Sequence, residues 1–288
     1  MAQNLQLLKR RIKTSKNIAQ IAKALEMIAA SKIKKAQYAA QNNRPYAQRI
    51  TQITGKIIST VKEKDFTHPY IKINPKKGSK TLLIAISPDR GLCGSLNTNL
   101  YKKLIEIDNK ETRIVTVGKK VGLFAAKLSF ELLSSYPMGN TLPEYSLVYE
   151  LKQIIDDQLK TGEIAEVKIV YADFVSLFTQ TPIVQQLLPL QIAVPEDKSI
   201  PEEADQNSIF EPNKQEILHA LLPYYLEIQL YNALLVAFTS EQAAQMVAMQ
   251  NAKNNAFDIA EYLNLVYNKS RQERITNEIL DLANSAQI

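Results

Sequence analysis

The last quarter of the chain alternates apolar and polar positions over a long stretch without a helix-breaking glycine. Between Asn213 and Asn284 there is one proline, Pro223, and no glycine. This pattern predicts one continuous helix, with Asn213 as its N-cap and Glu216 as the capping partner three residues on. At ~1.5 Å per residue this helix spans roughly 108 Å, whereas a compact protein of this length has a radius of gyration near ~19 Å. Its apolar face must therefore pack on another long helix or on other chains.

Within this predicted helix one apolar stripe recurs at four-residue steps. It consists of five leucines followed by four alanines: Leu218, Leu222, Leu226, Leu230, Leu234, Ala244, Ala248, Ala252 and Ala256. Strict four-residue steps drift around a helix of 3.6 residues per turn, so the stripe and its partner must wind around each other. Pro223 lies inside the helix and should kink it or open one hydrogen bond.

The N-terminal segment is amphipathic as well. Its apolar residues recur mostly at steps of three and four: Leu5, Leu8, Ile12, Ile18, Ile21, Leu25 and Ile28. They predict a helix over residues 3 to about 43, a bend at Pro45, and a helical pattern that resumes from Tyr46 to Val61. Small residues that could face the C-terminal alanines are Ala19, Ala22, Ala29, Ala36 and Ala40. An antiparallel coiled coil between the two terminal helices is the simplest arrangement that buries both stripes.

Between Lys80 and Gln191 the pattern changes to short β-rich runs that alternate with helical ones. Strands are predicted at 81–87, 113–117 and 166–171, with a further strand at 182–190 that is antiparallel to its predecessor, and helices at 95–107, 119–128 and 142–160. This alternation is typical of a small α/β sheet with crossover helices. The predicted domains are a coiled-coil helix at 1–62, an α/β domain at 80–191, an acidic linker at 192–212 and a coiled-coil helix at 213–288.

Charge is concentrated at the N-terminus, where residues 1–44 hold ten lysines and arginines against Glu26 alone. Such a segment attracts nucleic acid, anionic lipid or an acidic protein surface, or it is simply a solvated helix face. The lone Cys93 cannot form an internal disulfide. The start of the chain lacks the apolar core of a secretion signal, and we find no run of about 18 apolar residues. We therefore expect a bacterial cytoplasmic chain without direct membrane insertion.

Candidate chemistry is sparse. The run PDRGLCGSLN at 88–97 follows the first strand and could hold an anion, but it matches neither common phosphate-binding glycine pattern, and a tight structural turn is favoured. His68 and His219 are the only histidines, and neither has a second ligand at metal-binding spacing. We expect no catalytic site, no metal and no cofactor.

Four motifs then occur in a recognisable order. They are LEMIAASKIKKAQ at 25–37, DRGLCGSLN at 89–97, SEQAAQMVAMQN at 240–251 and LVYNKSRQERITNEI at 265–279. On these motifs the chain resembles the γ subunit of F-type ATP synthase over nearly its whole length. The resemblance implies a rotor shaft: an antiparallel coiled coil inside the ring of α and β subunits, with a Rossmann-like α/β foot on the ε subunit and the membrane c-ring.

The resemblance also implies a function and a set of contact residues. A γ subunit binds no ATP and couples proton-driven c-ring rotation to conformational cycling of the catalytic sites on β, at the cytoplasmic face of the bacterial inner membrane. By motif, the rotor–stator contacts would be Met27, Arg271, Gln272, Thr276, Leu280 and Leu282. The basic shaft residues would be Lys9, Arg10 and Arg11, and the foot residues toward ε and the c-ring would be Phe210 and Glu211.

Three positions depart from the family pattern. Gln245 stands where arginine is common, which removes one rotor–stator ion pair, and Ser95 and Leu96 replace a frequent Gly-Phe. The paired-cysteine insertion of chloroplast γ subunits is missing, so thiol regulation of that kind is not expected. Two alternatives stay open: a coiled-coil scaffold or adaptor without a rotary role, and nucleic-acid binding by the basic helix. The second is disfavoured because Tyr38 is the only aromatic residue in that stretch.

Overall fold

The computed structural model describes residues 2–60, 68–76, 78–190 and 213–285. The elements are α1 (Ala2–Thr60), β1 (Lys80–Ile86), α2 (Leu96–Ile105), β2 (Thr112–Val117), α3 (Lys119–Lys127), β3 (Glu131–Tyr136), α4 (Tyr145–Thr161), β4 (Ile164–Phe174), β5 (Gln180–Leu188) and α5 (Lys214–Ser285). The chain divides into two compact units, residues 1–31 with 245–288, and residues 32–244. Helices α1 and α5 contribute to both units.

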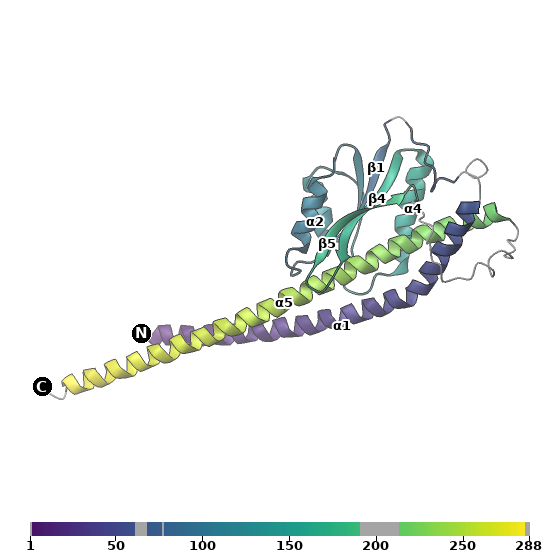
Figure 1. Cartoon of the computed structure of the whole chain (residues 1–288). Helices are drawn as coiled ribbons and strands as arrows, with labels where there is room; N and C mark the ends of the chain where they lie inside the picture. Colours follow the sequence, from purple (N-terminus) through teal and green to yellow (C-terminus); the bar gives the residue numbers. More distant parts are fainter. Residues whose placement is uncertain (1, 61–67, 77, 191–212, 286–288) are drawn as a thin grey trace. The chain divides into compact units, whose positions relative to one another are not determined.

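The larger unit is built on a five-stranded sheet in the order β3-β2-β1-β4-β5. Four strands are parallel, and β5 is antiparallel to β4, as the sequence predicts. Parallel neighbours need crossover connections, which α2, α3 and α4 provide. The result is a Rossmann-like sheet whose strands fall between α1 and α5 in the sequence, and Figure 1 shows the sheet on one side of α5.

Each sheet face has its own core because strand side chains alternate. In β1, Leu82, Ile84 and Ile86 pack with α4 and α5, while Leu83 and Ala85 pack with α2 and α3. All five residues are buried. The sheet is thus covered on both faces, which explains why the central strands are continuous apolar runs rather than alternating ones.

Helix α5 carries the predicted leucine stripe. Leu218, Leu222, Leu226, Leu230 and Leu234 are all 0% exposed and belong to the core over the sheet. The predicted N-cap is present, since Asn213 Oδ1 accepts the Glu216 N–H at 2.8 Å and the Asn213 amide donates to Glu216 Oε1 at 2.6 Å. Pro223 lies inside the helix without ending it.

By length and composition α5 is apolar enough to cross a membrane. The relevant 18-residue window has a mean hydropathy of 1.2, and 61% of it is buried within the protein. The core helix of a soluble protein has the same properties, so this observation is weak evidence for a span.

The sequence analysis missed one element of the sheet. Strand β3 was missed, because it is an edge strand whose residues are mostly exposed or half-buried and whose sequence, ELLSSY, has no continuous apolar run. The bend predicted at Pro45 lies inside a single helix, since α1 continues through Pro45 to Thr60. Figure 1 shows α1 bending in its C-terminal third, which is how a helix accommodates a proline in its interior.

Candidate interaction surface and buried polar sites

The smaller unit consists of two helix segments, residues 2–31 of α1 and 245–285 of α5. The buried positions of the α1 segment are Leu8, Ile12, Ser15, Ala19, Ala22 and Ala29, and those of the α5 segment are Met249, Ala256 and Ala260. From Leu8 to Ala22 these positions alternate at steps of four and three, and the half-buried Glu26 continues the pattern to Ala29, which is the heptad spacing of a coiled coil. The Lys253 ammonium and the Glu26 carboxylate form an ion pair across the seam at 2.8 Å.

The predicted seam was only partly correct. Ile18, Ile21 and Ile28 are exposed, although their spacing suggested the apolar face. The predicted small residues Ala19, Ala22 and Ala29 are buried in the seam, because small side chains let two helix backbones approach closely. Farther along the stripes, Ala248 and Ala252 are half-buried, and Ala40, in the larger unit, is exposed.

Large apolar side chains remain uncovered on both segments of the smaller unit. On α1 they are Leu7, Ile18, Ile21, Met27 and Ile28, and on α5 they are Phe257, Ile259, Tyr262, Leu265, Ile275, Ile279, Leu280 and Leu282. Monomeric proteins rarely expose so many large apolar residues on one small unit. We refer to these thirteen residues as the uncovered apolar surface, and it has the composition of a contact surface for other chains.

The sequence-predicted contact residues lie on this unit. Met27 is 65% exposed and Leu282 is 70% exposed. Arg271, Gln272, Thr276 and Leu280 belong to a run, 271–280, in which every side chain is exposed. Figure 1 shows this end of α5 continuing beyond the N-terminal end of α1. The structure therefore leaves these residues available to a partner.

The basic residues Lys9, Arg10 and Arg11 are also exposed, on α1. Phe210 and Glu211 lie outside the described residues. Gln245, where the family commonly has arginine, is half-buried.

In the glycine-rich loop after β1, the side chain of Asp89 accepts hydrogen bonds from three backbone N–H groups. Asp89 accepts N–H groups from Lys119 at 2.9 Å, from Met138 at 3.2 Å and from Gly139 at 2.9 Å. Lys119 begins α3, so Asp89 occupies one of the amides at which the N-terminus of α3 could hold an anion, and its other two donors lie in the loop after β3. The structural turn favoured from sequence is therefore present, and the position a phosphate would take is filled by Asp89.

Gly118 is required for the approach of this loop to β2. Its φ is +108°, and a Cβ atom there would lie 1.9 Å from the Ser87 carbonyl oxygen. The Ser87 hydroxyl accepts the Val121 N–H at 3.0 Å and donates to the Pro88 carbonyl at 3.2 Å. The first turn of α3 is thus tied directly to the end of β1.

Beside this loop lies Glu241 of α5, a largely buried carboxyl group. The pKa of Glu241 is raised to about 7; burial is the largest cause, Asp89 also raises the pKa, and Lys32 and Arg90 lower it. The Lys32 ammonium donates to Asn140 Oδ1 at 2.5 Å. Sequence reasoning missed Glu241 because its surroundings come from elements distant in the chain.

The two histidines meet in space despite their separation in sequence. The ring centroids of His68 and His219 are 5.0 Å apart, and the His68 ring also meets that of Tyr70 edge-on at 4.9 Å. Burial and the neighbouring His219 lower the pKa of His68 to about 4. Within the described parts of the chain, no group of three or more histidine, cysteine or acidic side chains could hold a metal ion.

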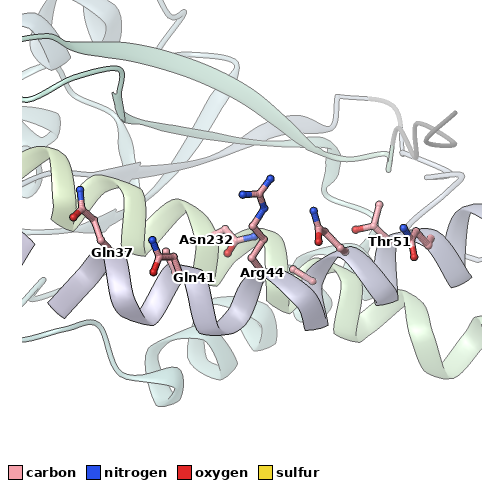
Figure 2. Close-up of a pocket in the computed structure, with 9 residues that line it drawn as sticks. Gln37, Gln41, Arg44, Thr51 and Asn232 are labelled. Carbon is pink, nitrogen blue, oxygen red and sulfur yellow. The ribbon is translucent and has the colours of Figure 1, made fainter. Parts of the chain in front are cut away.

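Two cavities flank α1 near Pro45 in the larger unit. The first is an open groove of about 760 Å³, lined by Gln37, Ala40, Gln41, Arg44, Ala47, Gln48, Thr51, Gln52 and Asn232 (Figure 2). The second, of about 300 Å³, is lined mainly by tyrosines from α1, α4 and α5. Neither places a nucleophile beside a base, so neither has the arrangement of a catalytic site.

Comparison with known proteins gives a consistent result over the full chain. The family model described as ATP synthase matches residues 4–287. A protein named ATP synthase gamma chain from Dehalococcoides mccartyi (strain BAV1) is 38% identical over 286 residues, covering 98% of each chain. The protein of the same name from Ruthia magnifica is 36% identical over 281 residues, covering 96% of each.

Solved structures agree in fold. A chain from the mitochondrial ATP synthase of Euglena gracilis in rotational state 3 matches with a TM-score of 0.69 at 18% identity, covering 100% of this chain and 95% of that one. A chain from the central stalk and c-ring structure of the Tetrahymena thermophila mitochondrial ATP synthase matches with a TM-score of 0.58 at 24% identity, covering 81% and 99%. At these identities the match concerns the fold.

Proposed function

This chain belongs to the ATP synthase gamma-chain family, and from that premise we propose that it is the central-stalk rotor subunit of a bacterial F1Fo ATP synthase. It couples proton-driven rotation of the c-ring to conformational cycling of the catalytic sites on the β subunits. The observation that carries the proposal is the full-length match to gamma chains, together with an α5 end that its own chain leaves uncovered.

The contact role of the α5 end follows from its exposure. Leu280 and Leu282 are large apolar side chains exposed to water. Burying each of them against surrounding subunits would contribute roughly 1.5–3 kcal/mol of binding free energy. Arg271, Gln272 and Thr276 are exposed polar groups on the same segment and make hydrogen bonds or ion pairs with β. Met27 adds an apolar contact from α1.

Rotation limits how strong these contacts can be. Exposed ion pairs contribute about 0–1 kcal/mol each, so Arg271 and Gln272 distinguish the three β subunits without locking the shaft at one angle. Breaking a buried charge pair would cost several times more free energy than breaking an exposed one. The exposed cations Lys9, Arg10 and Arg11 add a long-range attraction to acidic surfaces of the surrounding subunits.

The remaining assignments rest on the family. The α/β domain is the foot that contacts the ε subunit and the c-ring, with Phe210 and Glu211 at that contact. The chain has no catalytic site of its own and works as a peripheral component at the cytoplasmic face of the bacterial inner membrane. The domain division at residues 1–62, 80–191, 192–212 and 213–288 is part of the same proposal.

A double substitution tests the contact role in the assembled complex. Arg271→Ala with Gln272→Ala should lower both ATP hydrolysis and proton-driven synthesis, while the amount of assembled complex stays unchanged. Lys110→Ala, on an exposed loop of the α/β domain, is the matched control. Unchanged hydrolysis and synthesis in the double variant would contradict the contact role.

The alternative of a coiled-coil scaffold makes a different prediction. A tagged chain would then copurify with proteins other than the α and β subunits, or bind α and β without altering hydrolysis. Copurification of α and β in equal amounts, with hydrolysis that depends on this chain, supports the rotor.

A further inference from the structure

The smaller of the two cavities beside α1 is an aromatic site with a buried carboxylate. Its volume is about 300 Å³, and Tyr46, Tyr145, Tyr149, Tyr224 and Tyr231 line it. Of the described residues in its wall, only Glu227 is charged, and that residue is 3% exposed. The whole site lies within the larger unit, on α1, α4 and α5.

The cavity exists because the seam between α1 and α5 is underfilled there. Along α1 the buried positions are Ala36 and then Ile50, with none between them. The heptad steps continue through Ala40, Asn43 and Ala47, which are too small or too polar to fill a helix–helix interface. On either side of this gap α1 packs closely again, so the space is held open by the rest of the fold.

Three of the tyrosine rings contact one another. The ring centroid of Tyr145 is 5.2 Å from that of Tyr149, at an interplanar angle of 74°, and 5.3 Å from that of Tyr231, at 54°. Rings inclined in this way present faces in different directions around one space. The face of an aromatic ring carries partial negative charge and attracts a cation within about 6 Å of its centre.

Glu227 adds a formal negative charge at the inner wall. Its Oε1 is 3.0 Å from the Lys152 ammonium, and its Oε2 accepts the Tyr145 hydroxyl at 3.2 Å. A carboxylate has about four acceptor positions, so up to two remain for a ligand beyond these contacts. Lys152 is not among the residues that line the cavity.

We propose that this tyrosine cavity binds an organic cation, namely the guanidinium or ammonium head of an arginine-like or lysine-like ligand. The ring faces hold the cation, and Glu227 orients it through the open acceptor positions. A volume of about 300 Å³ accommodates such a head with part of its alkyl stem, at the small end of ligand sites. The negative ring faces disfavour an anion, while the charge of Glu227 is partly offset by its Lys152 partner.

The first experiment titrates the full chain with N-acetyl-arginine methylamide and with the corresponding citrulline compound, followed by calorimetry or NMR. Citrulline has nearly the same shape without the charge. We expect saturable binding of the arginine compound and at least about tenfold weaker binding of the citrulline compound. Spermidine is titrated in parallel. Tighter binding of spermidine than of the arginine compound would indicate a free amine as the ligand, and the reverse would indicate a side chain of a protein partner.

Variants locate the binding. Glu227→Gln removes the charge at constant shape, and Tyr149→Leu removes one ring at an exposed position; each should weaken binding about tenfold. Tyr38→Leu, an exposed tyrosine of α1 outside the cavity, should leave binding unchanged. If Glu227→Gln loses the native fold, the Tyr149 variant still tests the site.

Three results would contradict the proposal. They are no binding of either the arginine compound or spermidine, equal affinities for the arginine and citrulline compounds, and equal affinities of the Tyr149→Leu and Tyr38→Leu variants for the arginine compound. Because the isolated full chain is used, these outcomes are independent of whether the chain acts as a rotor.

Discussion

Glu241 offers the most quantitative test of the α/β core. Its carboxyl group is largely buried beside the loop after β1, where burial raises its pKa from 4.5 to about 7. The charged groups that act on it are Lys32 of α1 and Asp89 and Arg90 of the loop. Replacing the carboxyl with the neutral amide in Glu241→Gln removes the charge and keeps the shape.

The sign follows from proton linkage. Because the folded state holds this proton more tightly than the unfolded chain, the stabilisation is fully present below pH 4.5 and is lost as the pH rises through 7. A shift of about 2.5 pKa units at 1.36 kcal/mol per unit corresponds to about 3 kcal/mol. We therefore expect Glu241→Gln to be more stable than the wild type by up to about 3 kcal/mol at pH 8.5, and similar to it at pH 4.5.

Urea unfolding of both proteins, measured at half-unit steps between pH 4.5 and 8.5, checks this expectation. Glu106→Gln, at an exposed carboxylate of the same unit, is the control and should change stability by less than about 0.5 kcal/mol throughout. A stability difference between Glu241→Gln and the wild type that does not vary with pH would refute the argument that burial governs this group.

Substitutions at three further positions test the packing of the α/β domain. Leu226→Ala, at a residue that is 0% exposed, should cost about 2–5 kcal/mol in urea unfolding, and a loss below about 1 kcal/mol would mean that the stripe is not core. Gly118→Ala places a Cβ 1.9 Å from the Ser87 carbonyl oxygen and should cost at least about 3 kcal/mol or prevent folding; a thermal midpoint equal to that of the wild type would show that the loop can move aside. Asp89→Ala leaves three backbone N–H groups without their acceptor and should cost about 2–4 kcal/mol, whereas Asp89→Asn should retain part of that stability, and equal losses in calorimetry would contradict an acceptor role.

The sequence predicts elements with strong periodicity and misses those defined by distant partners. The α5 helix, its Asn213 cap and its leucine stripe follow from local rules of spacing and capping, and the structure confirms them. Strand β3 lacks such a signal because an edge strand is only half covered. On α1 the spacing of the isoleucines predicted the wrong buried face. A close helix–helix interface favours small residues over large apolar ones.

The candidate sites also differ in whether their residues are contiguous in sequence or come from distant elements. The proposed contact residues at 271–282 lie in, or directly after, one motif that is contiguous in sequence, so the resemblance could suggest them, and their contact role stays a prediction. Asp89, Glu241 and the tyrosine cavity could not be located, because each is assembled from three or more elements whose arrangement only the fold reveals. No short spacing pattern connects Tyr46 with Tyr145 and Tyr231.

The central claim is that this chain turns inside its complex, and a single-molecule rotation measurement tests it most directly. A Lys110→Cys substitution on the exposed loop before β2 provides an attachment point for a bead, since the natural Cys93 is only 2% exposed. With the α and β subunits fixed to a surface and ATP supplied, we predict stepwise rotation of the bead in one direction. Continued ATP hydrolysis by the complex with a stationary bead would contradict the rotor assignment.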